Sequence, residues 1–180
     1  MRTTWNRAAL ALAFCGFLCG SAGAQTAPPG RNLEQTFAAS LTDVPAGNAS
    51  TVGAIYVPVY SSISLTPGRL RADFSVTLSI HNASQDKPLI LRRIAYYDTG
   101  GLLVESYLAK PVALKPFGTI EIFIAQNDVR GGTGANFIVD WAAVGQIAEP
   151  VVEALMIGGL GAGHYAFISQ GRPIKTVGSN

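Results

Sequence analysis

The chain has 180 residues, of which 48% are hydrophobic and only 13% are charged, and its formal net charge is +2. This length and apolar content are sufficient for one globular domain with its own hydrophobic core. The basic residues are scattered along the sequence, so it lacks the concentrated positive charge that a nucleic-acid-binding surface requires.

The first 24 residues have the pattern of a cleavable signal peptide. Arg2 and Arg7 accompany a short apolar run at residues 8–20, and Ala22 and Ala24 supply the small residues of a cleavage site. The run is shorter than the roughly 20 residues that a membrane span needs. We therefore expect cleavage after Ala24, a periplasmic or secreted location, and no transmembrane segment in the mature chain.

Both cysteines, Cys15 and Cys19, lie inside this leader. Lipidation of either is disfavoured because Phe14 and Leu18 stand where lipoprotein processing requires a small residue. The mature chain then has no thiol, which excludes disulfides, thiolate metal sites and a cysteine nucleophile. Two of the 13 basic residues are lost with the leader and all 11 acidic residues lie beyond it, so the expected mature net charge is zero.

Residues 25–52 are rich in proline, glycine and small polar residues, and they predict a flexible N-terminal segment. A short helix at residues 32–39 is the only regular element that the spacing of Leu33 and Phe37 supports there. Residues 53–175 are expected to form a single domain, and residues 176–180 a disordered tail.

The strand signals begin with residues 55–60, where apolar and other residues alternate. Pro58 cannot donate to a β-ladder, so this strand is predicted to lie at the edge of a sheet. Residues 71–81 alternate without exception between apolar and polar side chains. Such a strand has one buried face and one face toward water, which is typical of an antiparallel sheet.

The next predicted strand, residues 89–97, changes phase at Arg92 and Arg93, as a β-bulge would. Residues 98–101 predict a turn, and residues 103–108 the return strand of a hairpin.

The rest of the chain predicts a connection at residues 110–118 and strands at residues 119–125, 137–141 and 164–169. Pro150 suits the first position of a helix, so a short helix is favoured for residues 149–156, although Val151 and Val152 also suit a strand. Residues 158–163 are glycine-rich and predict a flexible break. The expected fold is a mostly β, antiparallel β-sandwich of immunoglobulin-like architecture with at most one or two short helices.

Five segments in a fixed order together resemble a bacterial exported family catalogued as domain of unknown function 3124. They are Tyr56-Val57-Pro58-Val59-Tyr60-Ser61-Ser62, Thr77-Leu78-Ser79-Ile80-His81-Asn82, Tyr96-Tyr97-Asp98, Gly131-Gly132-Thr133-Gly134-Ala135-Asn136-Phe137, and Glu149-Pro150 leading to Glu153-Ala154-Leu155-Met156. The resemblance spans roughly residues 52–174. It implies a bacterial envelope or secreted location, and it implies no activity, substrate, cofactor or catalytic residue.

The loop at residues 127–136 is the sharpest candidate site. Gly131, Gly132 and Gly134 permit positive φ, so successive amides there can form a concave anion nest. The side chains of Asp128, Arg130 and Asn136 belong to the same predicted ligand-binding set. A structural turn is the competing and more frequent role of such a loop.

Tyr56 and Tyr60 share the strand face opposite Ile55, Val57 and Val59. They are the aromatic side chains least explained by burial in a core, and they are therefore candidates for a binding surface.

No residue is assigned a catalytic role. His81 and His164 are the only histidines and lack a nucleophile motif, and Glu149 with Glu153 is explained by a helix end. Asp128, Asn136 and Asp140 offer oxygen ligands for calcium, but their spacing fits no calcium loop. The prediction therefore contains no metal and no evident cofactor.

Three functions remain open from the sequence. The first is a non-catalytic binding module for an unknown protein, glycan or small-molecule ligand. The second is a hydrolytic or metal-dependent envelope enzyme with a site around residues 131–136, and the third is an envelope scaffold that self-associates through the strand at residues 55–60. An enzyme would bring Asp128, Asn136 or a histidine together with another ionisable group in one pocket.

Overall fold

The structure, a computed structural model, describes residues 33–160 and 162–178. The predicted signal peptide and residues 25–32 lie outside this part of the chain. The elements are α1 (Leu33–Thr36), η1 (Ala38–Ser40), β1 (Leu41–Thr42), β2 (Thr51–Pro58), β3 (Ser62–Thr66), β4 (Leu70–His81), β5 (Leu89–Tyr97), β6 (Leu103–Ser106), β7 (Val112–Leu114), β8 (Thr119–Ile124), β9 (Asn136–Ala143), β10 (Val151–Leu160), β11 (Gly163–Gln170) and β12 (Arg172–Gly178).

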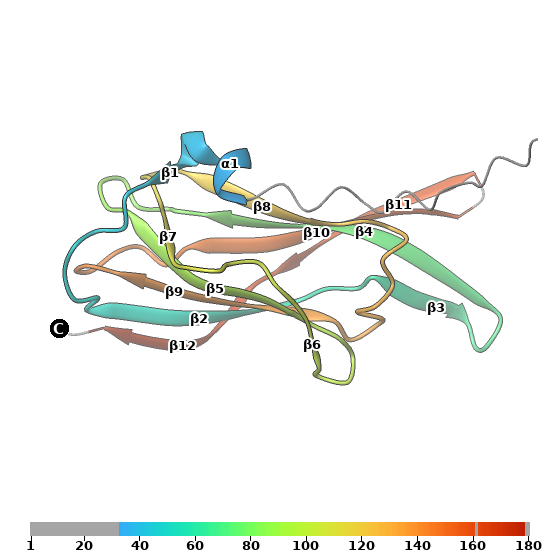
Figure 1. The fold of residues 1–180 in the computed structure, drawn as a ribbon. Helices are drawn as coiled ribbons and strands as arrows, with labels where there is room; N and C mark the ends of the chain where they lie inside the picture. Colours follow the sequence, from blue (N-terminus) through green and yellow to red (C-terminus); the bar gives the residue numbers. More distant parts are fainter. Residues whose placement is uncertain (1–32, 161, 179–180) are drawn as a thin grey trace, which may run out of the picture. The chain divides into compact units, whose positions relative to one another are not determined.

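The described strands form two antiparallel sheets (Figure 1). The seven-stranded sheet has the order β1-β7-β5-β9-β2-β12, with β6 paired to β5. The five-stranded sheet has the order β11-β10-β4-β3, with β8 paired to β4. This confirms the prediction of a mostly β, antiparallel fold with very little helix. Within the described part of the chain, no helix has the length and apolar character that crossing a membrane requires.

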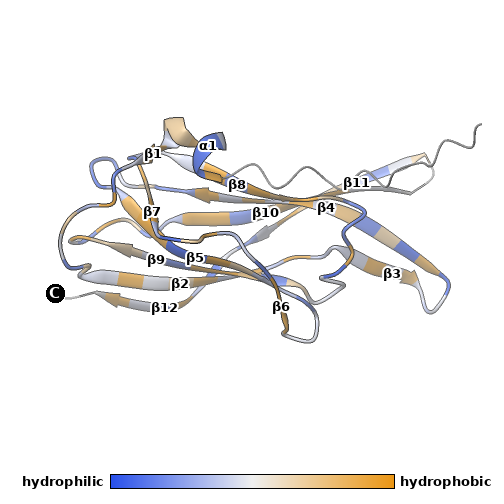
Figure 2. Ribbon diagram, in the orientation of Figure 1, coloured by the Kyte–Doolittle hydropathy of each residue, from blue (hydrophilic) through white to orange (hydrophobic). Residues whose placement is uncertain are grey.

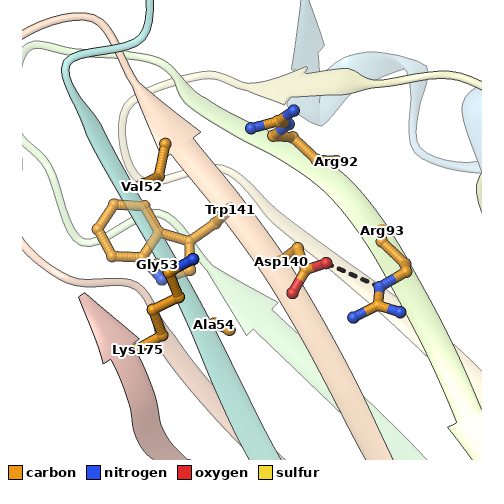
Figure 3. A pocket seen from close by; sticks show the side chains of 8 residues that line it. All are labelled: Val52, Gly53, Ala54, Arg92, Arg93, Asp140, Trp141 and Lys175. Carbon is orange, nitrogen blue, oxygen red and sulfur yellow. Dashed lines mark hydrogen bonds and ion pairs between the residues drawn. The ribbon is translucent and has the colours of Figure 1, made fainter. Parts of the chain in front are cut away.

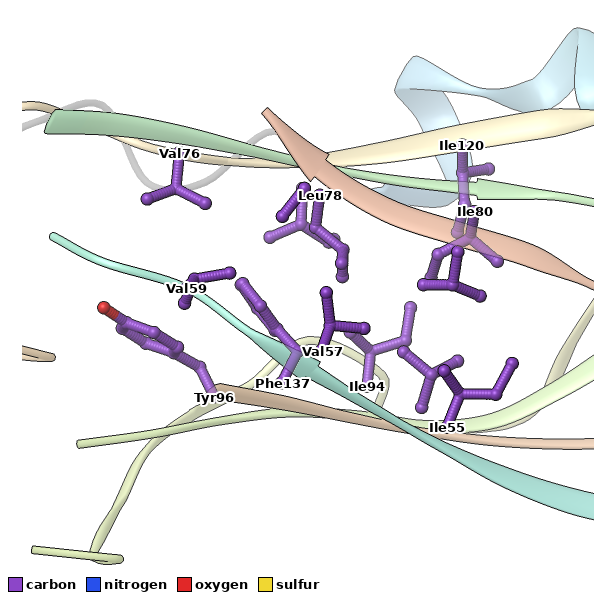
Figure 4. Close-up of a cluster of buried hydrophobic side chains, with 14 of the residues drawn as sticks. Ile55, Val57, Val59, Val76, Leu78, Ile80, Ile94, Tyr96, Ile120 and Phe137 are labelled. Atoms are coloured by element: carbon purple, nitrogen blue, oxygen red, sulfur yellow. The ribbon is translucent and has the colours of Figure 1, made fainter. Parts of the chain in front are cut away.

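The alternation in β4 determines which of its faces is buried. Ala72, Phe74, Val76, Leu78 and Ile80 are all buried, and the residues between them are only partly buried. The same alternation is visible as coloured bands along β4 in Figure 2. Figure 4 shows the buried side chains of β4 and β8 facing those of β2, β5 and β9, so both sheets contribute to one hydrophobic core.

The predicted β-bulge in β5 is confirmed. The pairing of β5 with β9 shifts register between Leu91, which lies opposite Trp141, and Arg93, which lies opposite Asp140. Arg92 is the additional residue, and both arginines are exposed while Leu91 and Ile94 on either side are buried.

The prediction that β2 lies at a sheet edge is wrong. β2 pairs with β9 along its whole length and with β12 from Thr51 to Tyr56. Pro58 is compatible with this central position because it lies beyond the last residue that pairs with β12. Residues 51–56 therefore have no free strand edge, whereas Val57 and Pro58 pair on one side only, with β9.

The helix favoured for residues 149–156 is also wrong, because residues 151–156 begin β10. Strand β10 pairs with β4 from Val151 to Gly158 and with β11 from Glu153 to Leu160. Bonding on both sides outweighs the local helix-start signal of Pro150. The predicted flexible break at residues 158–163 includes the end of β10, and Gly158 and Gly159 pair with Tyr165 and His164.

Three segments expected to be irregular contain paired strands. Within the segment predicted to be flexible, β1 pairs with β7, and Leu33, Phe37 and Leu41 pack against the core. The helix expected at residues 32–39 is found only as α1 and the short turn η1. β7 occupies the predicted connection, and β12 extends the domain into the expected tail because Thr176 to Gly178 pair with β2.

Candidate functional site

The glycine loop that the sequence singled out is held by hydrogen bonds within the protein. Gly132 N donates to Ser61 Oγ at 2.8 Å, and Gly134 N donates to Thr99 Oγ1 at 2.9 Å. The carbonyl of Gly132 accepts from Ser61 N, and that of Gly131 from Thr99 N. The two amides therefore have protein acceptors. These hydrogen bonds connect the loop, which precedes β9, to the residues that follow β2 and β5.

Gly131 has a packing role of its own, because any Cβ added there would collide with the Tyr96 hydroxyl. Tyr96 is fully buried and stacks on Phe137, with ring centroids 4.9 Å apart. Burial raises the pKa of Tyr96, and it does the same for the pKa of the neighbouring Tyr107. Both phenols are therefore neutral at physiological pH.

Asp128 and Arg130 form an ion pair at the edge of this loop. Arg130 donates from Nη2 to Asp128 Oδ2 at 2.6 Å and from Nε to Oδ1 at 2.8 Å, and it also contacts Glu105 Oε2 at 3.4 Å. The hydrogen bonds from Arg130 lower the pKa of Asp128, and those to Asp128 raise the pKa of Arg130. The charges of the loop are thus largely neutralised by one another.

The remaining residues singled out from the sequence do not converge. Asn136 and Asp140 lie four residues apart on β9, about 13 Å along an extended strand. No group of His, Cys, Asp and Glu within the described residues has the arrangement of a metal site. His81 shares hydrogen bonds with Ser79 and Thr119, His164 lies on β11, Glu149 accepts from Thr176, and Glu153 is part of β10.

The two candidate tyrosines are in different surroundings. Tyr60 packs against the core, and its ring centroid lies 5.9 Å from that of Phe167. Tyr56 is half-buried on β2, on the face opposite Ile55 and Val57. The structure therefore does not place them together as one aromatic platform.

A groove that the sequence did not predict lies on the seven-stranded sheet (Figure 3). We call it the β5–β12 groove, and its volume is about 350 Å³. It is lined by Val52, Gly53, Ala54, Arg92, Arg93, Asp140, Trp141 and Lys175. These residues come from β5, β9, β2 and β12, which are consecutive in the sheet.

The register of these strands places the polar residues of the groove in one row. Arg93 lies opposite Asp140, Asp140 opposite Ala54, and Ala54 opposite Lys175. Ala54 is the smallest side chain in the row, so it leaves a hollow between the longer side chains around it. The register of β12 also shifts between Pro173 and Lys175, so an irregularity flanks the groove on each side.

The charges of the groove are unevenly paired. Arg93 Nε donates to Asp140 Oδ2 at 2.7 Å, and Arg93 Nη1 donates to Tyr97 Oη at 3.3 Å. The hydrogen bond to Asp140 raises the pKa of Arg93. Arg92 and Lys175 have no hydrogen-bond or ion-pair partner among the described residues. Three basic residues and one acidic residue line the groove, which gives it a formal charge of +2.

One signal in the sequence pointed toward this groove. The change of phase at Arg92 and Arg93 predicted the bulge, but not that the two arginines would share a hollow with Lys175. Those residues are more than 80 positions apart in the sequence, and only the pairing β5-β9-β2-β12 joins them.

Comparisons with known proteins give a family and no activity. One solved structure, titled "Crystal Structure of Thermotoga maritima 1070", is similar to the chain with 12% sequence identity and a TM-score of 0.40, covering 67% of this chain and 92% of that one. No curated protein matches the chain. The family model described as "Protein of unknown function (DUF3124)" matches residues 52–174, which is more than half of the chain. The chain therefore belongs to the DUF3124 family of proteins of unknown function.

Proposed function

We propose that this protein is an exported, non-catalytic binding module whose ligand site is the β5–β12 groove. The observation that carries the proposal is a hollow of about 350 Å³ over Ala54 in which Arg92 and Lys175 are without partners. Small-molecule sites have volumes of about 300–1,000 Å³ and combine apolar surface with a few polar groups. The groove matches this description, because Val52 and Ala54 supply apolar surface and its charged side chains supply the polar groups.

The chemistry of the lining favours recognition over catalysis. Its described side chains include no hydroxyl, thiol or imidazole, and its single carboxylate, Asp140, is held by Arg93. A hydrolytic site would need a nucleophile or an activated water next to a base. Arginine and lysine instead bind and orient charged ligands.

The architecture that we propose for the domain is a β-sandwich of immunoglobulin-like type. Two antiparallel sheets that share one core support it, as do the many short connections between strands. In such a module the outer sheet faces carry recognition surfaces without disturbing the core.

Export is supported by the leader pattern at residues 1–24. Expression of the whole chain in a Gram-negative bacterium, followed by fractionation and N-terminal sequencing, tests it. We expect a periplasmic or secreted product that begins at Gln25. A product that retains Met1, or one that is lipidated at Cys15 or Cys19, contradicts the proposal.

The groove is tested by filling it without changing its charge. The processed protein is screened by thermal shift against sugars, peptides, carboxylates and phosphate, because a ligand at about 100 times its Kd stabilises the folded state by roughly 2.7 kcal/mol. Ala54→Phe should abolish the shift caused by any groove ligand. Ser106→Phe is the matched control, since Ser106 is an exposed strand residue of the same sheet outside the groove.

If a ligand stabilises wild type and Ala54→Phe equally, the groove is not its binding site. In that case the side chains of Asp128, Arg130 and Asn136, which stay a prediction from the sequence, are the next positions to test by substitution.

A further inference from the structure

The β5–β12 groove has positive charge at both ends and negative charge between them. Along the row of paired residues, Arg93 is followed by Asp140, then by Ala54 and then by Lys175. In Figure 3 the two arginines and Lys175 lie on different sides of Asp140. A ligand that matches this order is anionic at its ends and offers a hydrogen-bond donor near its centre.

Arg92 and Lys175, at opposite ends of the groove, are unpaired among the described residues, whereas Arg93 is paired with Asp140. Arg92 is the additional residue of the bulge in β5, and Lys175 follows the irregularity in β12, so one free cation lines the groove beside each irregularity. An unpaired guanidinium offers a planar fork of donors that fits a carboxylate with two hydrogen bonds, and an ammonium group offers a point charge with three donors.

The centre of the groove offers an acceptor. Asp140 Oδ2 accepts from Arg93, whereas Oδ1 accepts from no described residue. A carboxylate repels an anionic group placed next to it and accepts a hydrogen bond from a hydroxyl or amide. The middle of the ligand therefore has to be uncharged.

The spacing of the strands limits the length of the ligand. β5 and β12 are three strand spacings apart in the sheet, and each spacing is about 4.8 Å, so the backbones at the two ends of the groove are about 14 Å apart. Arginine and lysine side chains that lean inward shorten this distance. The length and the volume of the groove both correspond to a small molecule.

We infer that the β5–β12 groove binds an elongated small organic dianion, with one carboxylate held by Arg92, the other held by Lys175, and a hydrogen-bond donor facing Asp140. This rests on the proposed function only in that it uses the same groove. The carboxylates are the recognised groups, and the carbon chain between them packs over Ala54.

Isothermal titration of the processed protein with linear dicarboxylates of increasing chain length tests the inference. Monocarboxylates of the same lengths and neutral diols are the matched ligands, and a dicarboxylate with a central hydroxyl is compared with its unsubstituted parent. We expect one chain length to bind best, at least about 10-fold more tightly than its monocarboxylate, because a charged hydrogen bond is gained at the second end. The central hydroxyl should tighten binding further.

Arg92→Gln and Lys175→Gln should each weaken dicarboxylate binding by about 10- to 100-fold. Each variant should also remove most of the difference in affinity between a dicarboxylate and its monocarboxylate. Loss of a merely structural role of Arg92 or Lys175 would not do this. Arg69→Gln, an equal loss of charge in the exposed β3–β4 turn, should leave the affinity unchanged. Both groove residues are exposed, so circular dichroism should show folded variants.

Equal affinity for dicarboxylates and monocarboxylates overturns the inference, as does wild-type affinity in Arg92→Gln and Lys175→Gln. Ala54→Phe distinguishes a failure of this inference from a failure of the proposed binding site. If this variant blocks a neutral ligand that the charge variants still bind, the groove is a binding site for something other than a dianion. If it blocks nothing, the groove itself is not the site.

Discussion

Gly53 lies directly opposite Trp141 in the pairing of β2 with β9, and a Cβ on Gly53 would lie 2.5 Å from Cε2 and Nε1 of the indole. Trp141 is only 1% exposed and belongs to the core. The glycine thus leaves the space that the indole occupies, and both residues line the β5–β12 groove.

Gly53→Ala should destabilise the protein by about 1–3 kcal/mol, because the rigid indole has no room to move away from an added methyl group. Urea unfolding measures the change. Gly159→Ala is the matched control, since a Cβ at that β10 glycine meets nothing closer than 3.4 Å. In a Trp141→Leu background the cost of Gly53→Ala should be much smaller. Equal costs in both backgrounds would show that the indole is not the cause.

Tyr96→Phe should leave the protein at least as stable as wild type and raise its unfolding free energy by roughly 1 kcal/mol. Tyr96 Oη is the only buried side-chain polar atom in the described part of the chain without a hydrogen bond of good geometry, although the Ser61 side chain is close enough to lower its pKa. Removing it ends the cost of burying an unsatisfied hydroxyl and keeps the ring that stacks on Phe137.

Thermal and urea unfolding measure the effect of Tyr96→Phe. Tyr97→Phe is the control, because the Tyr97 hydroxyl accepts a hydrogen bond from Arg93, and that variant should gain nothing. A clear loss of stability in Tyr96→Phe contradicts the prediction.

The parts of the fold that the sequence predicts well are those with strong local signals. The alternation in β4 determines its buried face regardless of its neighbours. The change of phase in β5 is equally local, because a bulge moves the following side chains to the other face at once. The turn at Asp98 is predictable for the same reason, since Asp98 Oδ1 accepts from Gly100 N and Leu102 N.

The errors arise where distant pairing decides the structure. Pro150 and two glutamates favour a helix locally, but β10 is bonded on one side to β4 and on the other to β11. Pro58 indicates an edge strand only if its neighbour runs past it, and β12 ends its pairing at Tyr56. The groove was missed because its lining is defined by the order of four strands and not by any continuous motif.

Asp128 should make the protein sensitive to acid. Its pKa is lowered by hydrogen bonds from Arg130, so its charged form stabilises the folded state at any pH above the unfolded pKa of about 3.9. This contribution is lost as the pH falls through the lower pKa of the folded state. Asp128→Asn should therefore be less stable than wild type near neutral pH, and the difference should shrink in acid.

Urea unfolding of wild type and Asp128→Asn at a series of pH values measures this difference. Asp43→Asn, at an exposed position, serves as the control. A difference between wild type and Asp128→Asn that stays constant from neutral to strongly acidic pH would exclude ionisation as its cause.

Asp140→Asn should separate the two effects of Asp140 on a ligand in the β5–β12 groove. These are repulsion of its carboxylates and acceptance of a hydrogen bond from its central hydroxyl. Its ion pair with Arg93 joins side chains that are 33% and 46% exposed, and exposed pairs of this kind contribute at most about 1 kcal/mol, so the melting temperature should change little. Binding of an unsubstituted dicarboxylate should become tighter, by about five-fold, because the removed charge repels the ligand and the released Arg93 can bind it. The advantage of a central hydroxyl should decrease, since an amide is a weaker acceptor than a carboxylate.

Titration of Asp140→Asn with both ligands, compared with Asp43→Asn as an equal change of charge elsewhere, gives the result. Weaker binding of the unsubstituted dicarboxylate by Asp140→Asn would mean that Asp140 positions Arg93 for the ligand and does not compete with it. The carboxylate would then have to be bound by an Arg93 that Asp140 holds in place, and Arg93→Lys, which keeps the charge but loses the planar fork, should weaken binding to the same extent.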